Sequence, residues 1–369
     1  MFNPFVALPL LVCTYEILTM LLPLRISLTA KIFASLILLS GLAKIFLLHR
    51  TPSGFDMYEL PYYLTLTFTA IFNFIIVAVF LLLIKDCIQV FCRLILRKPF
   101  PNYYAALFVF SIALCATLYG TYEALKQPQI KTHEVVINNL GREFDNFRIA
   151  MLVDIHADTL TNREFVQELV TRTNALNPDL ILMPGDFVDG QVATRRADLE
   201  PLKDLRAKFG VYGTTGNHEY YFDFEGWQKE FKRLNITMLN NEHFIITSGD
   251  SQLIVAGVPD QTGDEHNTSL AVKDIPENAP VILMDHRPSE ARENSQYNIA
   301  LQLSGHTHGG QMPIIYSLVK KFNRGFVRGW YEVNNMKLFV SPGTSQWNGF
   351  ACRIFDPSEI SLLVLKAKP

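Results

Sequence analysis

Long apolar runs fill the first third of this 369-residue chain and constrain its fold more than any other feature. Four such runs, at residues 5–24, 26–48, 64–84 and 103–122, are dominated by Leu, Ile, Phe, Val and Ala. A helix that crosses a bilayer needs roughly 20 residues of this kind. A signal peptide would account for the first run only, and buried core helices rarely repeat such a pattern. The sequence therefore predicts an all-α transmembrane domain of four helices over residues 1–126.

The basic residues between these runs predict an orientation, because cytoplasmic loops are enriched in Lys and Arg. The connection after the third run is the richest, with Lys85, Arg93, Arg97 and Lys98. The first connection holds Arg25, and the second holds Arg50 beside two acidic residues. With four spans, both termini would lie outside the cytoplasm. We therefore expect a multi-pass protein of a plasma membrane or bacterial inner membrane whose second part is extracytoplasmic.

Residues 148–369 have the pattern of an α/β domain, preceded by a linker and first strand at 127–147. Apolar β-type runs at 148–153, 179–183 and 211–215 alternate with helical patterns at 163–176, 199–209 and 227–234. Such alternation predicts parallel strands joined by crossover helices. Paired strands are expected at 243–247 with 252–256, and further strands at 338–340, 351–355 and 360–365. After Lys126 there are 24 Lys and Arg against 30 Asp and Glu, which argues against a nucleic-acid partner.

Potential metal ligands follow several of these predicted strands. Asp154, Asp186 and Asn217 each come after one, about one βα unit apart. His286 and His306 follow the apolar runs 281–284 and 299–303. Because residues just past the carboxyl ends of neighbouring parallel strands converge on one crevice, these side chains should meet.

The spacing inside the clusters suggests individual roles. Asp154 and His156, like His306 and His308, are two residues apart, so in extended backbone both side chains of a pair face the same way. Asp186 lies between the first and third clusters and is the best candidate to bridge two cations. His218 directly follows Asn217 and is better suited to assist a leaving oxygen. A lone Gly-Asp or Asp-x-His is usually a turn or a solvated pair, so only the ordered combination predicts a dinuclear centre.

The combination resembles the motif series of calcineurin-like metallophosphoesterases: Asp154-Ile155-His156, Gly185-Asp186-Phe187-Val188-Asp189, Gly216-Asn217-His218-Glu219, His286 and Gly305-His306-Thr307-His308. The resemblance covers residues 148–369 and implies a four-layer α/β/β/α sandwich. It implies that one metal is held by Asp154, His156, Asp186 and His308. The other would be held by Asp186, Asn217, His286 and His306, with His218 acting on the leaving group. We expect Asp189 to buttress a ligand rather than to bind metal.

The continuation of the last motif to Gly309-Gly310-Gln311 is similar to a narrower, membrane-associated bacterial branch of that family. Some members of the branch cleave UDP-diacylglucosamine in lipid A synthesis. The expected cofactors are two divalent ions among Mn, Fe, Zn and Co, because the ligands are nitrogen and oxygen without thiolate. We favour Mn, and a metal-bound hydroxide is the expected nucleophile.

Substrate contacts are less specified by the sequence. Arg287, beside His286, is a candidate phosphate contact, and Tyr220 and Tyr221 are candidates to line the pocket. Residues 320–331 interleave Lys and Arg with aromatics, which suits either a membrane surface or an ordinary solvated loop. We expect a membrane-anchored phosphodiesterase or phosphatase that contacts membrane lipids and acts on a lipid or lipid-linked phosphate ester. A non-catalytic sensor or transport-associated module and a phosphoprotein phosphatase remain alternatives.

Overall fold

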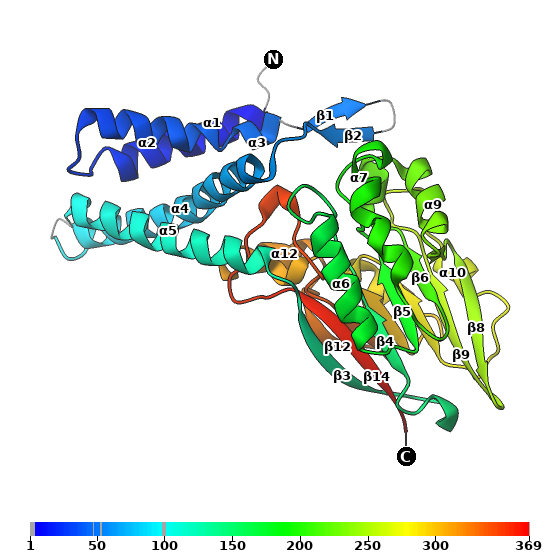
Figure 1. Ribbon diagram of the computed structural model, residues 1–369. Helices are drawn as coiled ribbons and strands as arrows, with labels where there is room; N and C mark the ends of the chain where they lie inside the picture. The colour runs from blue at the N-terminus through cyan, green and yellow to red at the C-terminus, as the bar shows by residue number, and fades with distance from the viewer. Residues whose placement is uncertain (1–3, 47, 52–53, 98–100, 369) are drawn as a thin grey trace. The chain divides into compact units, whose positions relative to one another are not determined.

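A computed structural model describes residues 4–46, 48–51, 54–97 and 101–368 of the chain (Figure 1). The chain divides into two compact units. One consists of residues 1–49, 57–124 and 349–354, and the other of residues 50–56, 125–348 and 355–369. We refer to them as the helical unit and the α/β unit.

The helical unit is built from apolar helices. They are α1 (Pro4–Glu16) with a π-helical turn (Ile17–Leu21), α2 (Leu28–Ser40), α3 (Ala43–Phe46), α4 (Tyr62–Leu94) and α5 (Asn102–Leu125). A two-stranded sheet of β1 (Leu48–Thr51) and β2 (Gly54–Met57) lies between α3 and α4 in the chain.

The helical unit differs from the expected four full spans. Among the described residues, three segments are long and apolar enough to cross a membrane: Leu28–Ile45, Tyr62–Leu94 and Asn102–Leu125. The first apolar run forms a shorter helix, Ala7–Leu21. Pro23, which has no backbone N–H to donate, lies two residues beyond its end. The four-helix expectation is therefore corrected to three candidate spans and one shorter apolar helix.

The helix formed by the third apolar run, α4, is longer than the sequence indicated. Because no Gly or Pro interrupts residues 62–94, α4 continues for 33 residues, about 50 Å at 1.5 Å per residue. Lys85 and Arg93, which we had assigned to a loop, are therefore helical. The Lys85 ammonium is buried and lies 2.9 Å from a carboxylate oxygen of Asp86. Lys98 lies outside the described residues.

The α/β unit contains two six-stranded mixed sheets. The first has the strand order β3 (Gln129–Ile137), β14 (Glu359–Ala367), β4 (Arg148–Met151), β5 (Leu180–Pro184), β6 (Val211–Thr214) and β7 (Thr237–Met238). The second has the order β12 (Gly329–Val333), β13 (Met336–Val340), β11 (Leu301–Ser304), β10 (Val281–Met284), β9 (Ser251–Gly257) and β8 (Glu242–Ser248).

Three apolar layers hold the two sheets and their helices together. Side chains of both sheets form the central core, which includes Met151, Leu182, Val255 and Met284. The outer face of the first sheet is covered by α6 (Arg163–Ala175), α7 (Val192–Leu199) and α9 (Phe224–Arg233) (Figure 1). The short helices α10 (Thr268–Ala271) and α11 (Ala291–Asn294) pack on the outer face of the second sheet. This arrangement confirms the predicted α/β/β/α sandwich.

Parallel pairing brings the loops that carry the predicted ligands to one edge of each sheet. In the first sheet, β4, β5 and β6 are parallel neighbours. In the second, β9, β10, β11 and β13 are parallel neighbours. The loops that leave β4, β5, β6, β10 and β11 contain every predicted metal ligand.

Two predicted elements are wrong. The helix expected at 199–209 is a 3₁₀ turn, Glu200–Asp204, because Pro201 supplies no N–H to continue α7. The strand expected at 351–355 belongs mostly to the helical unit. Its backbone hydrogen bonds go there instead of to a sheet: the Arg353 N–H donates to the Gly120 carbonyl (2.9 Å), and the Asn73 amide donates to the Ala351 carbonyl (2.7 Å).

Candidate metal centre

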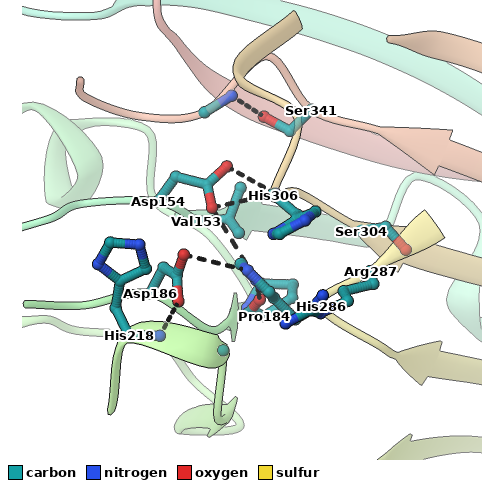
Figure 2. A network of polar contacts seen from close by, with 12 residues as sticks. Val153, Asp154, Pro184, Asp186, His218, His286, Arg287, Ser304, His306 and Ser341 are labelled. Atoms are coloured by element: carbon teal, nitrogen blue, oxygen red, sulfur yellow. Dashed lines mark hydrogen bonds and ion pairs between the residues drawn. The ribbon is translucent and has the colours of Figure 1, made fainter. Parts of the chain in front are cut away.

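The candidate ligands lie in tight turns directly after their strands (Figure 2). Five of them have left-handed backbone angles: Asp154 (φ 56°), His156 (φ 45°), Asp186 (φ 55°), His306 (φ 70°) and His308 (φ 47°). Non-glycine residues seldom adopt this region, which costs on the order of 1–3 kcal/mol each. Such strain clusters at functional sites, where the surrounding structure maintains it.

Among the described residues, three groups of potential ligand atoms lie inside the site. One of them, His156, Asp189 and His218, is joined by hydrogen bonds to Asp189. The other two consist of predicted ligands. In one, atoms of Asp154, His156 and His308 lie within 4.8 Å of one another. In the other, atoms of Asp186, His286 and His306 do the same. Each group offers nitrogen and carboxylate oxygen, the donor set of borderline divalent cations.

Asp186 lies between the two groups. Its Oδ2 atom is 3.2 Å from His286 Nε2 and 3.5 Å from His156 Nε2. Its Oδ1 atom accepts the backbone N–H of His218 at 2.9 Å, which fixes the carboxylate plane (Figure 2). One carboxylate is therefore in reach of both groups and could bridge two cations.

Several buried oxygen and nitrogen atoms are suited to bind cations. Asn217, the first residue of α8 (Asn217–Tyr221), has a buried Oδ1 atom without a hydrogen-bond partner among the described residues. Such orphaned acceptors are rare in proteins. His286 donates its Nδ1 proton to the Pro184 carbonyl (2.8 Å), which leaves Nε2 as the ligand atom. The Nε2 atoms of His156 and His308 are only 3.1 Å apart, a spacing that a shared cation explains.

Asp189 connects the first group to His218. Its Oδ1 atom accepts the Nδ1–H of His156 at 2.9 Å and that of His218 at 2.6 Å. Both imidazoles are thereby held with Nε2 directed away from Asp189. Burial opposes the charge of this carboxyl, but the two histidines hold its pKa below the usual range. Asp189 is therefore placed to position two histidines, His156 and His218.

The ionisable groups of the site shift one another's pKa values. Burial raises the pKa of Asp186, but His286 and His218 outweigh it and lower that pKa well below its usual range. In turn, although burial works against it, Asp186 raises the pKa of His286 to about 10. Burial together with the charge of His286 lowers the pKa of His306 to about 3. The two adjacent imidazoles therefore shift in opposite directions: Asp186 favours the charged form of His286, whereas burial and His286 favour the neutral form of His306.

The residues around His218 form an aromatic rim. Its ring lies 5.3 Å from that of Tyr221, 6.1 Å from that of Phe222 and 6.0 Å from that of Trp347. Tyr221 and Trp347 are both 40% exposed. Trp347 was not identified from the sequence, because it follows the last ligand by 39 positions and belongs to no motif.

The other two predicted substrate contacts already have partners. Arg287 forms a bidentate ion pair with Asp260 (Nε–Oδ2 2.7 Å, Nη2–Oδ1 3.0 Å) and a hydrogen bond to Thr262. Tyr220 stacks on Phe224, with ring centroids 4.3 Å apart. Asp260 was missed by the sequence analysis, since nothing in the chain around it signals a ligand or a partner.

Glu219 is a third residue whose role was missed. It is fully buried, and its carboxylate accepts the backbone N–H groups of Gly216 (2.7 Å), Asp186 (3.1 Å) and Phe187 (2.7 Å). It therefore ties the Asp186 turn to the Asn217 turn. The signal was present as the fourth residue of the Gly-Asn-His-Glu motif.

A segment from the other end of the chain braces the first turn. The Thr344 N–H donates to the Val153 carbonyl (2.7 Å), and the Ser345 N–H donates to the Asp154 carbonyl (3.1 Å). The Val153 N–H in turn donates to the Thr344 hydroxyl (2.9 Å). These bonds help to hold the left-handed Asp154 in place.

Comparison with known proteins agrees with the geometry. The calcineurin-like phosphoesterase profile matches residues 147–310. A zebrafish (Danio rerio) transmembrane protein with metallophosphoesterase domain is 29% identical over 327 residues, which cover 83% of this chain and 74% of the relative. An uncharacterised metallophosphoesterase of Campylobacter jejuni is 33% identical and covers 75% and 72% of the two chains. One from Helicobacter pylori is 32% identical, with 68% and 67% covered. The chain belongs to the calcineurin-like metallophosphoesterase family.

Proposed function

We propose that this protein is a membrane-anchored hydrolase of phosphoric esters that uses two divalent cations. The observation that carries the proposal is Asp186, whose Oδ2 atom is within 3.5 Å of a histidine from each ligand group. Family membership supports phosphoesterase chemistry in general. The two cations, the ligand assignment and the lipid substrate are our extension of it.

The residues would divide the work as follows. Asp154, His156 and His308 would hold one cation, Asn217, His286 and His306 the other, and Asp186 both. Two divalent cations, when bound, supply Lewis acidity toward phosphate oxygens and make water more acidic. We favour Mn among Mn, Fe, Zn and Co, and propose that residues 127–369 form the catalytic domain and its linker.

His218 would act on the leaving oxygen. Its Nδ1–H is held by Asp189, so Nε2 is the atom that can carry a proton to or from the substrate. Asp189 also keeps the ring in this orientation while Nε2 transfers the proton. A binding-only domain has no need for an imidazole oriented in this way, which favours catalysis over a sensor role.

The substrate is proposed to be a lipid or lipid-linked phosphate ester. The three candidate spans tether the site to a bilayer, which raises the effective concentration of membrane substrates. Tyr221 and Trp347 offer exposed apolar surface beside His218. Arg287 would contact phosphate through Nη1, since Nε and Nη2 are engaged, and Tyr220 would form a fixed part of the pocket wall.

The α/β unit is proposed to be extracytoplasmic, on a plasma membrane or bacterial inner membrane. This inference depends on the basic residues Arg93 and Arg97 at and beyond the end of α4, which favour a cytoplasmic α4–α5 connection. It is unaffected by the shorter first helix. A reporter fused after Pro369 that is active only in the cytoplasm would contradict it.

The catalytic proposal is tested with Asp186→Ala and His218→Ala in the full chain. Both should abolish the Mn²⁺-dependent hydrolysis of an aryl phosphodiester, whereas His243→Ala, a histidine that contacts the Ala271 carbonyl, should not. Bound metal with no turnover of any phosphate ester would favour the sensor alternative. Turnover of phosphopeptides alone would favour the phosphoprotein phosphatase. Membrane lipid extracts incubated with the wild type and with Asp186→Ala would identify the substrate.

A further inference from the structure

Helix α12 (Pro313–Phe322) is mostly apolar, yet none of its residues is buried. Its largest outward side chains are Ile314 (38% exposed), Leu318 (53%) and Phe322 (75%). They are four residues apart, so they form one stripe along the helix. A soluble surface helix normally turns such a stripe toward the core, and here the stripe faces outward.

One lysine lies next to this stripe, because Lys321 directly precedes Phe322. Lys320 is two residues from both Leu318 and Phe322 and therefore lies on the other side of the helix. Lys320 and Lys321 are exposed, and neither has an ion-pair partner in the part of the chain that the structure describes. The nearby arginines differ, because Arg324 pairs with Glu293 (2.6 Å) and Arg328 pairs with Asp356 (2.5 Å). An apolar stripe with the unpaired Lys321 beside it complements a surface that is both apolar and anionic.

We infer that α12 docks on an anionic lipid bilayer, with the stripe of Ile314, Leu318 and Phe322 in the interface and Lys321 on lipid phosphates. A helix with a large apolar face and a basic flank lies in the plane of a membrane in this way. The chain itself supplies the bilayer. Only residues 126–128 separate the candidate span α5 from β3, so the α/β unit cannot leave the membrane surface.

Docking would position the candidate metal centre. The helix begins five residues after His308, and the intervening chain is tight: the Met312 N–H donates to the Gly310 carbonyl (2.6 Å). The Tyr316 N–H donates to the Met312 carbonyl (3.2 Å). A bilayer that holds α12 therefore also holds the edge of the His308 turn close to lipid headgroups. The inference goes beyond the proposed hydrolase activity, and its test requires no turnover.

The test is hydrogen–deuterium exchange of the full chain in three environments: detergent, phosphatidylcholine nanodiscs, and nanodiscs with added phosphatidylglycerol. A ten-residue helix without buried residues is marginal alone, so its amides should exchange fast in detergent. In anionic nanodiscs, the peptide that covers residues 313–322 should exchange at least about tenfold more slowly. The helix α9 serves as the internal reference and should not change.

Variants separate docking from other causes of protection. Leu318→Ser with Phe322→Ser should remove the protection, as should Lys321→Gln. The control Leu270→Ser removes a leucine of similar exposure (50%) from α10. In this variant, the protection of residues 313–322 should be retained. Fast exchange in all three environments, or equal protection in the neutral and anionic nanodiscs, would overturn the inference. Protection in detergent that rises with protein concentration would assign the stripe to a second copy of the chain instead.

Discussion

Replacing Asp189 should damage the site twice, because one carboxylate oxygen orients two histidines. Asp189 Oδ1 accepts from both His156 and His218, at 2.9 and 2.6 Å. Asp189→Ala removes this acceptor, so the buried Nδ1–H of His156 and the partly buried Nδ1–H of His218 lose their hydrogen bonds. His156 would then lose its fixed orientation as a ligand, and His218 its fixed Nε2 direction.

The size of the effect follows from these two contacts. Loss of a residue that supports a metal ligand typically costs 10–100-fold in metal affinity or activity. Positioned acid catalysis contributes roughly 10²–10⁴-fold. At saturating metal, where the His156 defect is partly compensated, we expect kcat to fall about 10²-fold, or about 2.7 kcal/mol. Asp189→Asn retains an acceptor oxygen but loses the charge, and should cost about tenfold.

A double-mutant cycle with an aryl phosphodiester in Mn²⁺ provides the assay. If Asp189 acts through His218, Asp189→Ala should cost much less in the His218→Ala background than in the wild type. Metal content measured on the same samples isolates the His156 component. Fully additive losses, or an Asp189→Ala enzyme with wild-type kcat, would refute the reasoning.

Three further perturbations have defined outcomes. Glu219→Ala leaves three buried N–H groups unpaired. It should lower the free energy of unfolding of the α/β unit by at least about 3 kcal/mol, which would be measured as a lower Tm. An unchanged Tm would contradict the role assigned to the Glu219 carboxylate. Gly216→Ala would place a Cβ atom 2.2 Å from Asp186 Oδ1. Metal affinity should therefore fall by about tenfold or more, while the circular dichroism spectrum is retained. Tight metal binding by this variant would argue against Asp186 as the bridge. Chelation should lower Tm, because a cation at 100 times its Kd adds about 2.7 kcal/mol; a Tm insensitive to chelator and to added Mn²⁺ would exclude a bound metal.

The sequence was sufficient for the layers of the α/β unit because its signals are local. Apolar runs at 148–153, 179–183 and 211–215 correspond to β4, β5 and β6 within two residues. The hairpin expected at 243–256 is β8 and β9. Parallel topology then brings the residues after these strands to one rim, as Asp154 and Asp186 show.

Features that depend on tertiary contacts were missed. Trp347 reaches His218 although the two are far apart in the chain, and no periodicity announces such a contact. Residues 351–355 are apolar enough for a strand, yet their backbone partners are in the helical unit. The pairing of Arg287 with Asp260 was equally invisible, because the charges that surround a candidate contact are set by the fold.

The central claim is a pair of cations joined by Asp186, and metal stoichiometry tests it most directly. The purified full chain should be stripped of metal and titrated with Mn²⁺ while bound metal and phosphodiesterase activity are measured together. We predict two ions per chain at full activity, and a loss of both sites' high affinity in Asp186→Ala. Full activity with one ion or none, or an Asp186→Ala protein that still binds two ions tightly, would contradict it.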